Sequence, residues 1–244
     1  FNQLENNINA WSSTKLIVIG DTIFDQYTAC DPLGMSAEAP VLVLKELESK
    51  NFIGGASIVA SHIRSLGAKC DFISVVGNDL EADFINKQLS NQGINNKVVV
   101  DSSRPTTFKK RYLVGNQKLL RVSRMVDKAI NKEIEEKIIN NIEEASLNAQ
   151  GIVVSDFVYG VLTKNVIDCI LNMKRKYNLM LFADLQCSSQ TGNITKYNNF
   201  SLLCPNEREA RFAIQIKDIG LEMLSRELIR TTNCERLVMK LGAE

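Results

Sequence analysis

Five short apolar segments, each followed by a carboxylate or an amide, constrain the fold of this chain more than any other feature. They are LIVIGD ending at Asp21, FISVVGND at Asp79, GIVVSD at Asp156, LMLFAD at Asp184 and SLLCPN at Asn206. Runs of this length, rich in Val, Ile, Leu and Phe, are typical of strands buried on both faces of a parallel sheet. Because helix-patterned segments separate most of them, the sequence predicts an α/β domain.

The polar residues at the ends of these segments predict a binding site. In open parallel sheets, ligands bind in the crevice beyond the carboxyl ends of the strands. Acids and amides gathered there are placed to meet a polar substrate, a metal ion or phosphate groups. Any one of them is equally explained as a helix cap or a turn residue. Their repetition at five strand ends favours a site.

The segment from Thr106 to Arg124 breaks the α/β alternation. It has two β-patterned arms joined around Gly115-Asn116, which is hairpin chemistry. Together with residues 41–47, which follow a proline, it predicts a small antiparallel layer outside the main sheet. Lys109 and Arg111 have the spacing to face one side of a strand. Two interpretations stay open for this pair: binding of a phosphate group, or a solvated edge that discourages aggregation.

Composition excludes several classes of function. The chain has 244 residues and a net charge of +1, from 29 basic and 28 acidic residues, which argues against a nucleic-acid or membrane-surface binder. No apolar stretch approaches the roughly 20 residues of a membrane span. Six scattered cysteines and one histidine cannot assemble a zinc site of ordinary spacing. The Walker and dinucleotide fingerprints are absent, which disfavours a Rossmann-type oxidoreductase. A cytoplasmic enzyme is the resulting prediction.

The order of the motifs resembles a known family. GDTIFDQY, GGASIVA, VVGND, the basic hairpin, SDFVYG and CPNEREA follow one another as in the ribokinase-like (PfkB) sugar kinases, from Leu16 to Glu244. Within that family the chain is similar to the heptose-7-phosphate kinase domain of ADP-heptose synthesis. The resemblance implies a three-layer α/β/α fold with a mostly parallel central sheet and a small β-sheet lid, whose strands are expected at about 33–48 and 104–124.

The resemblance also implies an activity and its cofactors. The expected reaction is ATP-dependent transfer of the γ-phosphoryl group to a hydroxyl of a sugar such as heptose 7-phosphate, with Mg²⁺. Family members often dimerise through the lid layer, so we expect a homodimer. No nucleic-acid or membrane partner is expected.

Site residues follow by matching positions. The implied substrate-binding set is Asp21, Asp25, Gly54, Gly55, Lys109, Arg111, Asn116 and Asp156. Asp25 matches the sugar-binding carboxylate, whereas Asp21 either contacts substrate or orients the loop. The implied nucleotide-binding set is Asp184, Asn206, Glu209 and Lys240, with Asn206 and Glu209 reaching Mg²⁺ through water.

Several positions depart from the family pattern. Ile58 stands where the family usually has Asn, Tyr159 replaces the lysine of the DY.KG segment, and Gln186 replaces the lysine of DPK. No G-A-G-D motif, which supplies the anion hole and the catalytic base, occurs up to Glu244. We therefore expect residues 1–244 to be an incomplete kinase domain, inactive alone, whose base follows Glu244. The alternative is a non-catalytic, sugar-phosphate-binding subunit.

Overall fold

The computed structural model describes residues 5, 8–187, 192–216 and 218–242. Its strands are β1 Lys15–Gly20, β2 Thr22–Met35, β3 Leu42–Gly55, β4 Lys69–Ile73, β5 Val75–Val76, β6 Asn95–Asn96, β7 Val99–Val100, β8 Phe108–Val114, β9 Gln117–Arg124, β10 Gly151–Asp156, β11 Met180–Leu185 and β12 Leu202–Leu203. Its helices are η1 Trp11–Ser13, α2 Ala56–Ser65, α3 Leu80–Asn91, α4 Lys132–Ser146, α5 Lys164–Tyr177, η2 Ile194–Lys196, α6 Glu207–Ile214 and α7 Leu221–Thr232.

The central sheet has six strands in the order β12-β11-β10-β1-β4-β6. Every neighbouring pair in it is parallel. The apolar segments found in the sequence form these strands, although FISVVGND divides into β4 and the short β5, which pairs with β7 in a separate two-stranded sheet. The predicted parallel α/β architecture is therefore confirmed.

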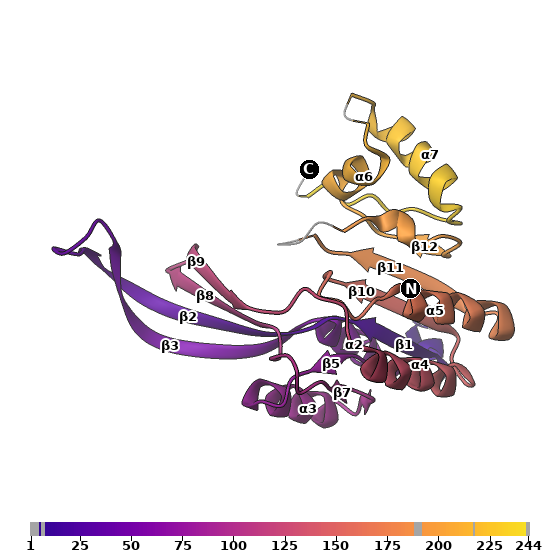
Figure 1. Ribbon diagram of the computed structural model, residues 1–244, viewed down its shortest axis with the longest axis horizontal. Coiled ribbons are helices and arrows are strands. Elements are labelled where there is room, and N and C mark those ends of the chain that lie inside the picture. Colours follow the sequence, from indigo (N-terminus) through magenta and orange to yellow (C-terminus); the bar gives the residue numbers. More distant parts are fainter. Residues whose placement is uncertain (1–4, 6–7, 188–191, 217, 243–244) are drawn as a thin grey trace.

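Helices cover both faces of this sheet (Figure 1). Along β1, Ile17 and Ile19 belong to a core cluster that includes residues of α4 and α5. The intervening Val18 belongs to a second cluster, with residues of α2 and α3. Successive side chains of a strand point to opposite faces, so the two clusters lie on opposite sides of the sheet. This gives the expected three layers.

A second, four-stranded sheet in the order β3-β2-β8-β9 forms the lid. Its long strands β2 and β3 extend well away from the central sheet as a curved ribbon (Figure 1). The prediction of a purely antiparallel layer was wrong, because β2 pairs antiparallel with β3 but parallel with β8. Residues 41–47 lie mostly in β3 and pair with β2 rather than with the β8–β9 hairpin.

The lid also contains a strand that the sequence analysis did not identify. β2 starts at Thr22 and runs for 14 residues to Met35. The β2–β3 register shifts between Pro32 and Gly34, which lets the pair accommodate a proline.

Within the described part of the chain, no helix has both the length and the apolarity needed to cross a lipid bilayer.

Candidate functional site

A cavity of about 620 Å³ lies where the lid meets the central domain. Its lining residues are Ile23, Asp25, Tyr27, Lys50, Phe52, Ile53, Gly54, Gly55, Ile58, Lys109, Arg111 and Phe157. Five of the eight predicted substrate residues are among them: Asp25, Gly54, Gly55, Lys109 and Arg111. The lid strands β2, β3 and β8 and the start of α2 provide most of this lining.

An ion pair dominates the polar part of the cavity. The Arg111 guanidinium donates to the Asp25 carboxylate, and both side chains are largely buried. The same guanidinium lies 5.0 Å from the centre of the Tyr27 ring. An Arg held between a carboxylate and an aromatic face has a fixed orientation. This wall therefore presents a carboxylate and a cation in defined positions.

Two glycines allow close packing at the base of the lid, Gly54 against the Asp25 carboxylate and Gly55 against the Asp21 backbone. A Cβ added at Gly54 would lie 2.2 Å from Oδ2 of Asp25, and one added at Gly55 would lie 2.2 Å from the Asp21 carbonyl oxygen. Gly55 also has a φ of 64°, in the left-handed region that side chains rarely adopt. The GG pair is thus required by close packing at the base of the lid.

Lys109 is 2% exposed, although its side chain reaches the cavity wall. Its Nζ lies 5.2 Å from the ring centres of both Phe157 and Tyr159. The solvated-edge interpretation is therefore wrong for Lys109. Lys109 therefore adds a buried positive charge to this wall of the cavity.

Asp21 lies outside the cavity lining and is 2% exposed. Its carboxylate accepts backbone N–H bonds from Phe157 at 2.8 Å, Tyr159 at 3.1 Å and Val161 at 3.4 Å. Burial and the nearby Asp156 raise the pKa of Asp21 to about 7, against the opposing effect of these bonds. The geometry agrees with loop orientation, the second of the two roles open for Asp21.

Asp156 is also absent from the lining of the cavity. Its carboxylate accepts from the Val158 N–H at 2.8 Å and from the Tyr197 hydroxyl at 2.6 Å, and it pairs with Lys196 at 2.6 Å.

Asn116 lies in the β8–β9 turn and does not line the cavity. Asp79 is the N-cap of α3, accepting from Ala82, and it also accepts from the Thr106 N–H.

A second cavity of about 480 Å³ lies beyond the ends of β11 and β12. Its lining residues are Asn206, Glu207, Arg208, Arg211, Lys240, Leu241 and Gly242. Lys240 pairs with Asp184 at 2.5 Å, and its backbone forms a bridge with Asn206. Three predicted nucleotide residues thus lie together, and the cations Arg208, Arg211 and Lys240 line this cavity beside one carboxylate, Glu207, which pairs with Arg211 at 2.7 Å.

Glu209 has a structural role in this region. Asn206 and Glu209 form a capping box at the start of α6, with Glu209 accepting from the Asn206 N–H at 2.8 Å. Its other oxygen accepts from the Cys187 N–H at 3.0 Å, and the residue is 4% exposed. Across the described ranges no cluster of three acidic, His or Cys side chains is placed to hold a metal ion. These residues fit Mg²⁺ only through water and bound phosphate oxygens.

The aromatic part of the 620 Å³ cavity was not predicted from the sequence; this cavity is called the sugar-side cavity below because five of the implied substrate-binding residues line it. Tyr27, Phe52 and Phe157 line it, and the Tyr27 and Phe52 rings meet edge to face at 5.6 Å. Tyr27 and Phe52 lie on paired lid strands, so recognising β2 as a strand would have found them. Ile58, one of the departures from the family pattern, also lines this cavity.

Curated relatives resemble most of the chain. Bifunctional protein HldE of Campylobacter jejuni subsp. jejuni serotype O:6 is 32% identical over 212 residues, covering 87% of this chain and 44% of the relative. The HldE of Helicobacter pylori strain J99 is 34% identical over 205 residues, covering 83% of this chain and 43% of the relative. The chain thus spans less than half the length of these relatives.

Solved structures share the fold at low identity. Phosphofructokinase-2 from Escherichia coli in complex with fructose-6-phosphate has a TM-score of 0.71 and 15% identity, covering 94% of this chain and 74% of that chain. A putative sugar kinase from Clostridium perfringens has a TM-score of 0.62 and 16% identity, covering 94% and 70%. Residues 13–244 match the family described as pfkB family carbohydrate kinase. Because that match includes the lid and both cavities, the chain belongs to the pfkB family of carbohydrate kinases.

Proposed function

We propose that this protein transfers the γ-phosphoryl group of ATP to a hydroxyl of a phosphorylated sugar, and that heptose 7-phosphate is the substrate. The observation that carries this proposal is the cavity in which Asp25, Lys109 and Arg111 converge. A carboxylate accepts hydrogen bonds from vicinal sugar hydroxyls, and paired cations bind a phosphate group. The choice of a heptose phosphate rests on the sequence resemblance to the heptose-7-phosphate kinase domain.

Each side chain has a distinct task in this proposal. Arg111 and Lys109 hold the phosphate already present on the sugar, and Asp25 accepts from its hydroxyls. A phosphate arriving at Arg111 takes over part of its pairing, so that Asp25 becomes available to the sugar. The aromatic and aliphatic lining from Tyr27, Phe52 and Ile58 packs against the carbon skeleton.

The second cavity takes the nucleotide in this proposal. Lys240 and Asn206 approach the phosphates of ATP, while Asp184 fixes the position of Lys240. Mg²⁺ supplies charge neutralisation of the transferring phosphoryl group, which needs positioning more than covalent chemistry. It would be held through water by Asn206, with Glu209 ordering that residue through the capping box.

The catalytic base is a separate question. The 244 residues contain no G-A-G-D motif. Loss of a general base typically lowers a rate by about 10²–10⁴-fold. We therefore propose that these 244 residues alone bind the sugar phosphate but turn it over poorly. A sugar-phosphate-binding subunit without catalysis is the second candidate, favoured by Tyr159 and Gln186 at two positions where the family has lysines.

We also propose a homodimer formed through the lid, in a cytoplasmic protein. Strands β3 and β9 form the edges of the lid sheet. Several of its apolar side chains are exposed, among them Leu33 at 64%, Leu42 at 49% and Leu120 at 56%. Exposed strand edges pair readily with another copy, and two-fold dimers are the commonest oligomers.

Calorimetric titration tests the sugar site. A panel of sugar phosphates, including heptose 7-phosphate and fructose 6-phosphate, is compared with the same sugars lacking the phosphate, with and without Mg-ATP. Ligands that bind the folded state also raise its stability, by about 2.7 kcal/mol at 100 times Kd. We expect binding to depend on the phosphate. Equal affinity for phosphorylated and unphosphorylated sugars, or no binding of either, contradicts the proposal.

A further inference from the structure

The loop between β10 and α5 contains a strained residue. Val158 has a φ of 63°, in the left-handed region. For a β-branched side chain this conformation is a true outlier, and it persists only where the surroundings determine it. Strain of this kind concentrates at functional sites. The contacts that hold residues 157–161 are therefore the place to look for the function of this loop.

Two carboxylates hold the loop from the side of the central sheet. Asp156 accepts from the N–H of Val158 itself at 2.8 Å. Asp21 accepts from the N–H groups of Phe157, Tyr159 and Val161. These bonds fix the amide side of the loop, on both sides of the strained residue.

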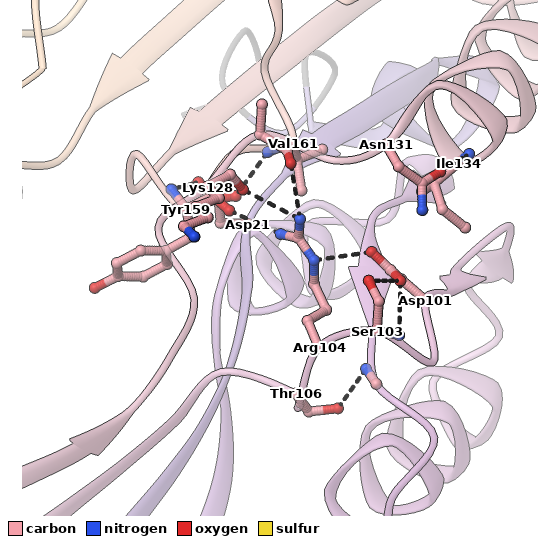
Figure 2. A network of polar contacts seen from close by, with 12 residues as sticks. Asp21, Asp101, Ser103, Arg104, Thr106, Lys128, Asn131, Ile134, Tyr159 and Val161 are labelled. Atoms are coloured by element: carbon pink, nitrogen blue, oxygen red, sulfur yellow. Dashed lines mark hydrogen bonds and ion pairs between the residues drawn. The ribbon is translucent and has the colours of Figure 1, made fainter.

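Arg104 holds the same loop through its carbonyl side (Figure 2). One guanidinium nitrogen donates to the Tyr159 carbonyl at 3.1 Å. Another donates to the carbonyls of Lys128 and Ala129, both at 3.1 Å. The two backbone segments also touch directly, because a Cβ added at Gly160 would lie 2.1 Å from the Lys128 carbonyl oxygen. One side chain thus ties together three carbonyls from two segments.

Asp101 fixes Arg104 in this position. Its carboxylate accepts from the Arg104 Nε at 2.9 Å, and the two side chains are 3% and 10% exposed. Asp101 also accepts from the Ser103 N–H and hydroxyl, and its own N–H donates to the Val76 carbonyl at 2.8 Å. A guanidinium with a charged partner on one side and carbonyls on the other is a rigid, directional clamp.

The clamped loop provides one ring of the sugar-side cavity lining, Phe157, and a second, buried ring, Tyr159, that is stacked on it. Phe157 lines that cavity, and its ring is stacked on that of Tyr159 at 6.4 Å. The Lys109 ammonium lies 5.2 Å from both ring centres. Tyr159 is held at its N–H by Asp21 and at its carbonyl by Arg104. The backbone position of the aromatic pair, and with it the environment of Lys109, depends on these two charged residues.

We propose that Arg104 is a positioning residue for sugar-phosphate binding, acting through the strained loop on Phe157, Tyr159 and Lys109. It does not line the sugar-side cavity. Substituting Arg104 changes none of the side chains that line the cavity. It removes the hydrogen bond to the Tyr159 carbonyl, so that Val158 can leave its strained conformation and the rings of Phe157 and Tyr159 shift. This inference rests on the proposed function, because it assigns Arg104 to the same binding event.

Calorimetric titration of heptose 7-phosphate and fructose 6-phosphate into Arg104→Gln and Arg104→Lys tests the proposal. We expect Arg104→Gln to weaken binding at least tenfold, and Arg104→Lys to fall between it and the parent protein, because an ammonium reaches fewer of the three carbonyls. Ile85→Val is the control for general destabilisation, because Ile85 is fully buried in α3 and does not line the sugar-side cavity. It is expected to lower Tm without changing Kd.

A second variant separates positioning from loss of fold. Asparagine adopts the left-handed conformation far more readily than valine. Val158→Asn in the Arg104→Gln background should therefore restore most of the lost affinity. Hydrogen exchange gives a readout without ligand: the amides of Tyr159 and Val161 should exchange faster in Arg104→Gln and unchanged in Ile85→Val.

The outcomes distinguish this inference from the proposed function. If the parent protein binds a sugar phosphate and Arg104→Gln binds it equally well, the positioning role is overturned and the proposed function stands. If Ile85→Val weakens binding as much as Arg104→Gln, the loss reflects general destabilisation and the proposal fails. If exchange at Tyr159 is unchanged in Arg104→Gln, Arg104 does not hold the loop and the proposal fails as well. If the parent binds no sugar phosphate, the proposed function fails first and the binding role fails with it.

Discussion

Asp25 and Lys109 are direct register partners in the parallel pair of β2 and β8, yet the Asp25 carboxylate forms its ion pair with Arg111, two residues further along β8. Lys109 is instead packed against the rings of Phe157 and Tyr159. The two cations therefore have different surroundings on one wall of the cavity. Arg111 pairs with a carboxylate and lies over the Tyr27 ring, whereas Lys109 lies against the rings of Phe157 and Tyr159, so substitutions at the two positions should have different effects.

Removing the Asp25 charge should weaken sugar-phosphate binding. In Asp25→Asn the sugar hydroxyls lose a charged acceptor. A hydrogen bond to a charged group contributes about 1.5–3 kcal/mol, which is roughly 10- to 100-fold in Kd. Titration calorimetry measures the effect. Asp31→Asn, on the exposed part of the same strand, is the control and should bind normally. Unchanged affinity in Asp25→Asn would remove Asp25 from the site.

Adding one methyl group at Gly54 should have a similar effect without removing any charge. The new Cβ would lie 2.2 Å from Asp25 Oδ2, so the carboxylate must move. We expect Gly54→Ala to lose at least tenfold in affinity for the sugar phosphate, measured by the same titration. Gly220→Ala is the control, because nothing lies within 4 Å of its added Cβ. Normal binding by Gly54→Ala would show that the position of Asp25 is not critical.

Stability should depend on pH through Asp21. Its pKa is raised by burial and by Asp156 from 3.8 to about 7, so the folded protein binds this proton more tightly than the unfolded chain. The resulting stabilisation is complete below about pH 4 and is lost as the pH rises to about 7. Between pH 4 and pH 7, the Tm of the parent protein should therefore fall by more than the Tm of Asp21→Asn. Identical slopes in the two proteins would contradict the raised pKa.

The lid dimer predicts a defined change in mass. The double variant Leu42→Lys, Leu120→Lys places two charges on the exposed apolar surface of the lid. We expect size-exclusion chromatography with light scattering to show a dimer for the parent and a monomer for the variant, with unchanged Tm. A parent protein that is monomeric at every concentration rules out this interface.

The parallel sheet could be predicted because its strands are continuous apolar runs, a pattern that burial on both faces imposes. Strand β2 could not, because TIFDQYTACDPLGM contains two Asp, a Pro and a Gly, which are uncommon in strands. Its conformation comes from pairing with β3 and β8 and from a register shift near Pro32. Tertiary pairing overrides local propensity here, and with β2 the aromatic lining at Tyr27 was missed.

The candidate site was predictable where chemistry and position coincide. Asp25, Lys109 and Arg111 were identified from the resemblance, and they lie together at the cavity. The strand-end acids were harder, because a ligand contact and a structural contact use the same residue types. Asp79 and Asn206 are helix caps, and Asp21 binds backbone amides. No local pattern predicts a left-handed valine or a three-carbonyl clamp at Arg104, since both depend on contacts between distant segments.

The two long strands of the lid, β2 and β3, are attached to the central sheet at the same residue, Asp21. β2 leaves the central domain one residue after Asp21, and the first amide after β3, that of Ala56, donates to the Asp21 carbonyl at 2.9 Å. The ends of both strands are therefore anchored at Asp21, whose carboxylate accepts from the Phe157 N–H. A displacement of β2 and β3 relative to the central sheet would therefore be transmitted through Asp21 to the loop that carries Phe157.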